Sequence, residues 1–211
     1  MTKPLCIDLF CGYGGWARGF LDAGYRVIGF DNELKCAKRY TGEFVLADVR
    51  TLDGTRFRGA RVIVASPPCQ GFSVARIGVN WTPPPENRPK TEKAVQAVEL
   101  VKETLRIIHE AEPESWFIEN PVGKLRSLGI VPGVHKTITQ CQYVGKWRKP
   151  TDLWGTFDFG TYLKEPCHNG DRCHEEAHRG AKTGVQGVRD PNERALIPYP
   201  LARALADACL P

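Results

Sequence analysis

The chain has 211 residues, of which 42% are hydrophobic, enough for one well-buried domain and too few for two full ones. It contains no apolar run of about 18 residues, and residues 1–4 lack the features of a signal peptide. We therefore expect a soluble, cytoplasmic protein of a prokaryotic or phage-infected cell, without a membrane partner. The net charge of +5 permits a polyanionic partner without requiring one. The eight cysteines are scattered, several in apolar segments, which favours free thiols over disulfides.

Short apolar runs alternate with helical patterns along the first half of the chain. We predict strands at residues 5–9, 25–30, 44–46, 61–65 and 116–118, and helices at 16–23, 33–40 and 91–111. Thr91 is placed to cap the last of these helices. Strands and helices that alternate at this spacing indicate an α/β fold with a parallel sheet wound on both faces.

The later part of the chain is less regular. Residues 72–92 contain four prolines and predict an irregular loop, and residues 136–141 are expected to continue the sheet. Between about 157 and 192 aliphatic residues are few and glycine and basic residues are many. An apolar helix is predicted at 200–209. We divide the chain into a core at 1–155, a short inserted segment at 156–192 and a closing segment at 193–211.

The ends of the first three predicted strands carry residues suited to a nucleotide-like cofactor. The first strand runs into a glycine-rich turn at residues 10–15, which lets the backbone approach a ligand closely. Asp31 ends the second strand, where a carboxylate can accept hydrogen bonds from ribose hydroxyls, and Asp48 follows the third. Three such features at consecutive strand ends favour cofactor binding, although they do not exclude NAD.

The fourth and fifth strands end in residues that suit covalent catalysis. Cys69 follows two prolines that fix the backbone after the fourth strand, at the sheet edge where open α/β folds build their active sites. A cysteine in such a turn can act as a reactive thiolate. Glu119 ends the fifth strand on the same edge, where a carboxyl group could polarise an electron-poor ring.

Three segments, taken in order and at these separations, resemble the DNA (cytosine-5)-methyltransferase family. They are Asp8-Leu9-Phe10-Cys11-Gly12-Tyr13-Gly14-Gly15, Pro67-Pro68-Cys69-Gln70-Gly71-Phe72-Ser73 and Glu119-Asn120-Pro121. The resemblance covers roughly residues 5–155 and the last 15 residues. It implies that the closing segment at 193–211 returns a strand and a helix to the cofactor pocket. It implies a Rossmann-like, S-adenosylmethionine-dependent methyltransferase fold with a small irregular insertion.

The same resemblance implies a mechanism and a set of site residues. Cytosine would be flipped out of the DNA, Cys69 would add to its C6, and Glu119 would hold or protonate N3. The loop at residues 71–88 would close over the flipped base, with Ser73 near a phosphate. The cofactor residues would be Asp8, Phe10, Cys11, Gly12, Gly14, Gly15, Asp31, Asn32, Asp48, Val49 and Pro67.

The chain departs from the family pattern at several positions. Pro121 stands where valine is common. The family's downstream arginine motif cannot be aligned exactly with Gln142, Arg148 and Lys149. We predict that Arg148 is the arginine on the cytosine side; the alternative is that these residues belong to a solvated basic loop. Arg194 stands near where the family has a Gly-Asn pair, so a donor carrying an extra carboxylate is a minor alternative to S-adenosylmethionine.

The inserted segment is much shorter than a usual target-recognition region. Its basic, glycine-rich composition suits contacts with DNA phosphates, and we expect a duplex DNA substrate and a monomeric protein.

Potential zinc ligands cluster in the same segment. They are Cys167, His168, Cys173, His174 and His178, but their spacing fits no common zinc arrangement, so we predict no metal.

Other functions are less well supported by these residues. An RNA (tRNA) cytosine-5 methyltransferase would carry the same motifs. A non-catalytic nucleic-acid-binding protein would not need both Cys69 and Glu119, and an NAD-dependent oxidoreductase gives no reason for the Pro-Pro-Cys-Gln turn.

Overall fold

The computed structural model describes residues 2–156, 162–176, 184–185 and 188–210. Its centre is a seven-stranded sheet with the strand order β3-β2-β1-β4-β5-β7-β6. Five strands are parallel: β1 (Leu5–Leu9), β2 (Arg26–Asp31), β3 (Glu43–Leu46), β4 (Val62–Ala65) and β5 (Ser115–Pro121). β7 (Pro150–Gly155) runs antiparallel to both β5 and β6 (His135–Thr139). The predicted α/β fold is confirmed, with the first five strands of the chain parallel to one another.

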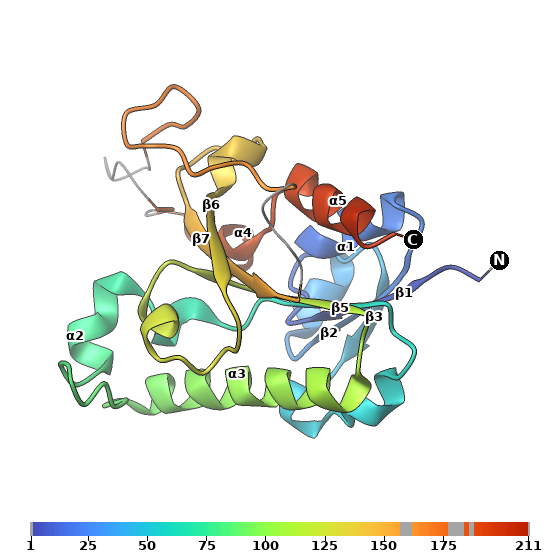
Figure 1. Cartoon of the computed structure of the whole chain (residues 1–211), viewed down its shortest axis with the longest axis horizontal. Helices are drawn as coiled ribbons and strands as arrows, with labels where there is room; N and C mark the ends of the chain where they lie inside the picture. Colours follow the sequence, from blue (N-terminus) through green and yellow to red (C-terminus); the bar gives the residue numbers. More distant parts are fainter. Residues whose placement is uncertain (1, 157–161, 177–183, 186–187, 211) are drawn as a thin grey trace.

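Helices cover both faces of this sheet (Figure 1). The helices α1 (Gly15–Asp22) and α5 (Tyr199–Ala208) pack on one face, and α3 (Glu92–Ala111) packs on the other. The shorter helices are α2 (Ile77–Asn80) and α4 (Pro191–Ala195). Single turns of 3-10 helix are η1 (Leu34–Lys38), η2 (Val49–Thr51), η3 (Gly54–Phe57), η4 (Cys69–Gly71), η5 (Val74–Arg76), η6 (Lys124–Ser127) and η7 (Gln140–Tyr143).

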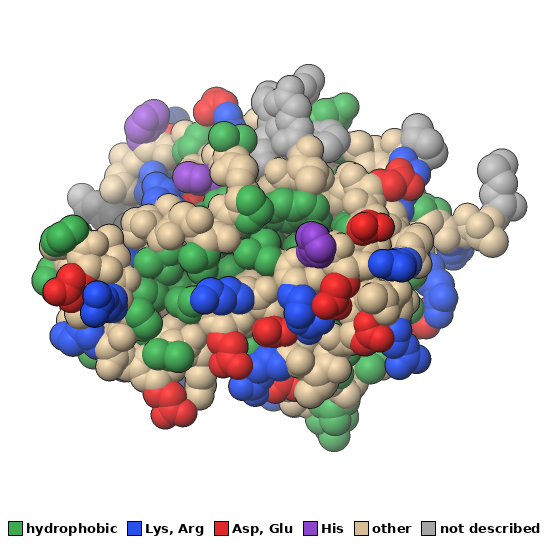
Figure 2. All heavy atoms as spheres, turned by 60° about the horizontal axis from the view of Figure 1, so that its bottom comes forward, with side chains coloured by type: hydrophobic (Ala, Val, Ile, Leu, Met, Phe, Trp, Pro, Cys, Tyr) green, Lys and Arg blue, Asp and Glu red, His purple; other side chains and the backbone are tan. Residues whose placement is uncertain are grey.

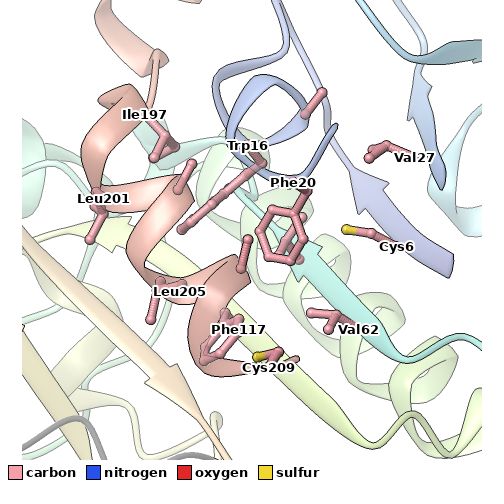
Figure 3. Packing of buried hydrophobic residues seen from close by; sticks show 14 of the residues in the cluster. Cys6, Trp16, Phe20, Val27, Val62, Phe117, Ile197, Leu201, Leu205 and Cys209 are labelled. Carbon is pink, nitrogen blue, oxygen red and sulfur yellow. The ribbon is translucent and has the colours of Figure 1, made fainter. Parts of the chain in front are cut away.

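Successive residues of the central strands contribute to opposite cores, as the pleat of a strand requires. In β1, Cys6 faces the core under α1 and α5, whereas Ile7 faces the core under α3. Figure 3 shows the first core, where Trp16 and Phe20 of α1 meet Leu201 and Leu205 of α5 above the sheet. The end of the chain therefore packs directly on its first helix.

The long helix α3 forms as the sequence predicts. The hydroxyl of Thr91 accepts a hydrogen bond from the backbone N–H of Ala94, which satisfies one of the free amides at the helix start. Its buried residues include Val101 and Ile107, which pack against the sheet. Acidic and basic side chains mix on this side of the molecule and surround an apolar area (Figure 2). The face is therefore not a single basic surface for a polyanion.

Three local expectations differ from the structure. The helix expected at 33–40 is only the 3-10 turn η1, and the described part of 193–210 is helical, without the strand that the family resemblance implied. Strand β7 was not predicted. No helix among the described residues is long and apolar enough to cross a bilayer.

Candidate active site

The site lies where the carboxyl ends of the parallel strands meet. The strand order reverses direction at β1, so the turns after β1 and β4 border the same crevice. The turn after β1 holds the glycine-rich segment, and the turn after β4 holds Cys69. Glu119 lies within β5, next to β4 in the sheet. The topology thus brings the predicted cofactor and catalytic segments to one edge.

The glycine-rich turn needs unusual backbone conformations. Gly12 has φ +49° and Gly14 has φ +81°, which suit glycine, and Phe10 is held at φ +57°. A Cβ at Gly15 would lie 2.4 Å from the backbone nitrogen of Ile197, so this residue must be glycine for the closing segment to pack here. Cys11, also predicted at the cofactor, is buried beside the turn.

Asp31 joins the turn to the end of β2. Its Oδ2 accepts a hydrogen bond of 2.9 Å from the backbone N–H of Gly12, and its Oδ1 accepts one of 2.9 Å from the backbone N–H of Glu33. A pocket of about 160 Å³ opens beside it. The pocket is lined by Phe10, Asp31, Asn32, Ala47, Asp48, Val49, Arg50, Pro68, Gln96 and Leu100. Five predicted cofactor residues (Phe10, Asp31, Asn32, Asp48 and Val49) therefore share one pocket.

The pocket also contains residues that sequence reasoning missed. Arg50 makes a salt bridge of 2.5 Å with Asp48, and this hydrogen-bonded guanidinium lowers the pKa of the Asp48 carboxyl. Gln96 and Leu100 belong to α3 and line the pocket because this helix packs beside it. The sequence pattern of the helix does not indicate this contact. Pro68 lines the pocket, whereas the carbonyl of the predicted Pro67 accepts a hydrogen bond of 2.8 Å from the Asn120 amide.

Asp8 lies in the core instead of the pocket. It is fully buried, its Oδ2 accepts a hydrogen bond of 3.2 Å from the Tyr40 hydroxyl, and its Oδ1 has no partner among the described residues. Burial raises the pKa of Asp8 to about 8, although the bond from Tyr40 offsets part of this effect. Asp8 is therefore a buried residue whose raised pKa favours the protonated form at neutral pH.

Cys69 and Glu119 form the polar centre of the site. Cys69 begins η4 and is half-buried, while Glu119 is 3% exposed. Burial raises the pKa of the Cys69 thiol. The Lys149 ammonium acts in the opposite direction and lowers this pKa, while the Glu119 carboxylate raises it further. Burial also raises the pKa of Glu119, against the lowering effect of Lys149. The charges of the thiol and the carboxyl group thus interact, and the Lys149 ammonium acts on both.

The adjacent basic residues Arg148 and Lys149 make different contacts. The ammonium of Lys149 is buried and lies 3.6 Å from Oε1 of Glu119. The Arg148 guanidinium instead donates hydrogen bonds of 3.2 and 3.0 Å to the carbonyl of Cys167. The structure therefore places Lys149, and not Arg148, beside the carboxyl group of Glu119.

The loop after Cys69 is anchored at both ends. The side chains of Asn80 and Trp81 donate hydrogen bonds of 3.1 and 2.8 Å to the carbonyl of Gly71. Ser73 forms an isolated antiparallel bridge with Gly123 after β5. Between these anchors Val74 and Val79 are 63% and 55% exposed. The loop thus presents apolar side chains to solvent beside the thiol.

The segment before α5 closes over the glycine turn. Asp190 accepts a hydrogen bond of 2.7 Å from the Tyr13 hydroxyl, and Asn192 donates one of 2.9 Å to Glu33. Arg194 donates a hydrogen bond of 2.8 Å to the carbonyl of Val188, and its charge lowers the pKa of Cys69. Sequence reasoning identified Arg194 but missed Asp190 and Asn192.

Three of the five proposed zinc ligands come together outside this site. Cys167, Cys173 and His174 lie beside Cys141, which the sequence did not suggest. His168 is exposed and is not part of the group, and His178 lies outside the described residues.

Comparison with known proteins agrees with these features. A family model described as C-5 cytosine-specific DNA methylase matches residues 5–150. The type II methyltransferase M1.HphI of Haemophilus parahaemolyticus is 30% identical over 127 residues, which are 54% of this chain and 31% of that protein. The DNA (cytosine-5-)-methyltransferase M.ApeKI of Aeropyrum pernix is 30% identical over 147 residues, 58% of this chain and 30% of that protein. The chain spans about a third of the length of these curated relatives.

Solved structures show the same fold. The methyltransferase EhMeth of Entamoeba histolytica has a TM-score of 0.55 at 12% identity, covering 80% of this chain and 57% of that one. A prophage-encoded E. coli protein described as a DNA modification methyltransferase has a TM-score of 0.53 at 17% identity, covering 77% of this chain and 51% of that one.

Proposed function

Because the chain belongs to the C-5 cytosine-specific DNA methylase family, we propose that it methylates C5 of cytosine in DNA with Cys69 as the covalent nucleophile. The observation that supports this most directly is the buried Glu119, whose carboxyl group is paired with Lys149 and interacts electrostatically with the Cys69 thiol. Such a group can activate a ring toward attack by a thiolate. Duplex DNA, a flipped base and a monomeric enzyme are parts of this proposal.

The residues at the sheet edge suit S-adenosylmethionine. The Asp31 carboxylate borders the 160 Å³ pocket and is held by backbone amides, in a position to accept hydrogen bonds from ribose hydroxyls. Asp48, Asn32 and Val49 line the part of the pocket where an adenine would bind. The cofactor supplies an electrophilic methyl group on a sulfonium, and these residues bind and orient it.

Cys69 and Glu119 perform complementary parts of the reaction. The Cys69 thiolate forms a bond to C6 of cytosine while Glu119 donates a proton to N3, which makes C5 nucleophilic. The raised pKa of Glu119 keeps its acid form present at a higher pH than an exposed glutamate would allow. After C5 has received the methyl group, which leaves the cofactor as a neutral thioether, loss of the C5 proton to water re-forms the C5–C6 double bond and expels Cys69 as thiolate. N3 finally returns its proton to Glu119, which carries a negative charge until then. Lys149 stabilises the negative charge left on Glu119.

The test uses tritiated S-adenosylmethionine with mixed-sequence duplex DNA, folded tRNA as a second substrate and a carboxylated donor as a third arm. The Cys69→Ser variant is compared with Cys209→Ala, which removes a buried thiol at the opposite edge of the sheet, where the Cys209 carbonyl accepts a hydrogen bond from Arg61. We expect label in 5-methyldeoxycytidine with the wild type and Cys209→Ala, and none with Cys69→Ser.

A covalent trap tests the nucleophile separately. DNA containing 5-fluorocytosine should form a stable adduct with the wild type, because fluorine cannot leave C5 as a cation, and no adduct with Cys69→Ser. Label in tRNA alone would move the proposal to the RNA branch. A protein that fails to bind S-adenosylhomocysteine would contradict the proposal.

A further inference from the structure

Four metal-binding side chains converge in a group that includes neither the thiol nor the carboxyl of the proposed reaction. Cys141 lies in η7, directly after β6, and Cys167, Cys173 and His174 lie in the segment 162–176. Their three sulfur atoms and one ring nitrogen all lie within 4.8 Å of one another. Cysteines and a histidine that come from two separate segments rarely meet by chance with all their ligand atoms facing inward.

Four of the six separations between the ligand atoms lie within about 0.5 Å of the edges of a tetrahedral zinc site. The Sγ atoms of Cys141 and Cys167 lie 3.3 Å apart, and those of Cys141 and Cys173 lie 3.8 Å apart. Nδ1 of His174 lies 3.8 Å from the sulfur of Cys167 and 3.5 Å from that of Cys173. With Zn–S of about 2.3 Å and Zn–N of about 2.0 Å, a tetrahedron has S···S edges of about 3.8 Å and S···N edges of about 3.5 Å.

A disulfide explains the group less well. The shortest sulfur separation, 3.3 Å, is far longer than the roughly 2.05 Å of an S–S bond. One disulfide would also leave a third thiol and the imidazole unexplained.

The donor set selects the kind of metal. Three thiolates and one imidazole are soft to intermediate ligands, which favour zinc over magnesium or calcium. All four positions of a tetrahedron would be filled by protein, which is typical of a structural and not a catalytic site. The surrounding bonds also fix the ligands: the Cys167 backbone N–H donates to Thr139, and Arg148 donates twice to the Cys167 carbonyl.

We propose that Cys141, Cys167, Cys173 and His174 bind one structural Zn²⁺ ion, which fastens the segment 162–176 to the end of β6. The need for such a link follows from the composition of this segment. Among its described residues the buried hydrophobic side chains are only Leu163 and Cys167, so apolar packing alone gives it little stability. The proposal reverses the sequence-based preference for no metal, because Cys141 completes a set that the segment alone lacks.

Metal analysis of the purified full chain tests the site independently of methyl transfer. The protein is produced in zinc-supplemented medium, purified under reducing conditions without chelator, and its zinc content is measured by mass spectrometry. We expect one zinc per chain. Replacement by Co²⁺ should give the intense visible absorption of a tetrahedral cobalt-thiolate site.

Two variants and one control locate the ligands. Cys173→Ser changes an exposed thiol and His174→Ala changes a partly exposed imidazole, so neither creates a cavity in the sheet core. Both should bind zinc at least tenfold more weakly, whereas His168→Ala, an exposed histidine of the same segment, should keep one zinc per chain. Full zinc content in Cys173→Ser, absence of zinc from folded wild type, or a Cys141–Cys167 disulfide found under those reducing conditions would each overturn the proposal.

Discussion

Lys149 offers the sharpest test of how the site works, because it is the buried cation next to Glu119. The Lys149→Met substitution keeps the length of the side chain and removes the charge. Two unit charges 3.6 Å apart attract by about 4–5 kcal/mol at an effective dielectric constant of about 20. We take about half of this attraction to be present in the transition state and absent from the resting site. Its loss then raises the activation free energy by about 2 kcal/mol, which lowers the rate roughly 30-fold.

The direction of the pH effect follows from the same contact. Lys149 lowers the pKa of Cys69, so its removal should raise that pKa further and shift formation of the thiolate to higher pH. Methyl transfer by Lys149→Met should therefore fall most at neutral pH and recover in part at alkaline pH. Alkylation of Cys69 by iodoacetamide, followed by mass spectrometry of its peptide, measures the thiolate without requiring turnover.

Two comparison variants make this test specific. Lys146→Met removes an exposed lysine that pairs with Glu175, and it should leave both the rate and the alkylation midpoint unchanged. Arg148→Met removes the arginine that the sequence favoured. The reasoning is refuted if Lys149→Met works within threefold of the wild type with an unchanged alkylation midpoint while Arg148→Met loses activity.

Three further substitutions test other parts of the structure. Asp8 has a folded-state pKa of about 8 against about 3.9 in the unfolded chain, so the stability that it contributes is complete below about pH 4 and is lost as the pH rises toward 8. In urea unfolding, the free energy of unfolding of Asp8→Asn should therefore rise relative to wild type by about 1.4 kcal/mol per pH unit between pH 5 and 8. Parallel pH curves for the two proteins would contradict this. Glu119→Gln should lower methyl transfer by about 100-fold or more while calorimetry finds unchanged binding of S-adenosylhomocysteine, since Glu119 acts on the base; weakened cofactor binding would place it elsewhere. Gly19→Ala brings a Cβ to 2.5 Å from the backbone nitrogen of Arg203 and should destabilise the protein by about 1–3 kcal/mol in thermal unfolding. Gly78→Ala, which has open space around it, should not change the stability. Equal effects of the two substitutions would show that α1 and α5 do not pack this closely.

Local patterns were sufficient for the parallel half of the sheet and for α3. The apolar runs of β1, β2 and β4 are buried on both faces and read as continuous hydrophobic stretches, and Thr91 marks the start of α3. Because the carboxyl ends of parallel strands meet at one edge, the proximity of Asp31 to the glycine turn and the shared edge of Cys69 and Glu119 followed from the order of elements alone.

The antiparallel part of the sheet could not be predicted in this way. Strand β7 buries two polar residues, Thr151 and Asp152, which break the apolar pattern expected of a central strand. Asp152 is accommodated because Arg126 and Thr137 donate hydrogen bonds to it. Without β7 the position of Lys149, directly before that strand, is not determined by the sequence, and Arg148 is the arginine that best matches the family's downstream motif.

The connection between β6 and β7 links the two sites that these proposals describe. Gln140 precedes the metal ligand Cys141, and its backbone N–H donates a hydrogen bond of 3.1 Å to the carbonyl of Lys149. Arg148, next to Lys149, donates to the carbonyl of the ligand Cys167. A zinc ion at one end of this connection would therefore hold Lys149 in place at the other.

This coupling has a measurable signature. Removal of zinc from the wild type should lower methyl transfer, because Lys149 loses its fixed position beside Glu119. In Lys149→Met the same removal should change the rate little, since the cation that the zinc would position is already gone. If zinc removal lowers the rate by the same factor in both proteins, the metal acts through another part of the molecule, such as a direct contact of the segment 162–176 with DNA.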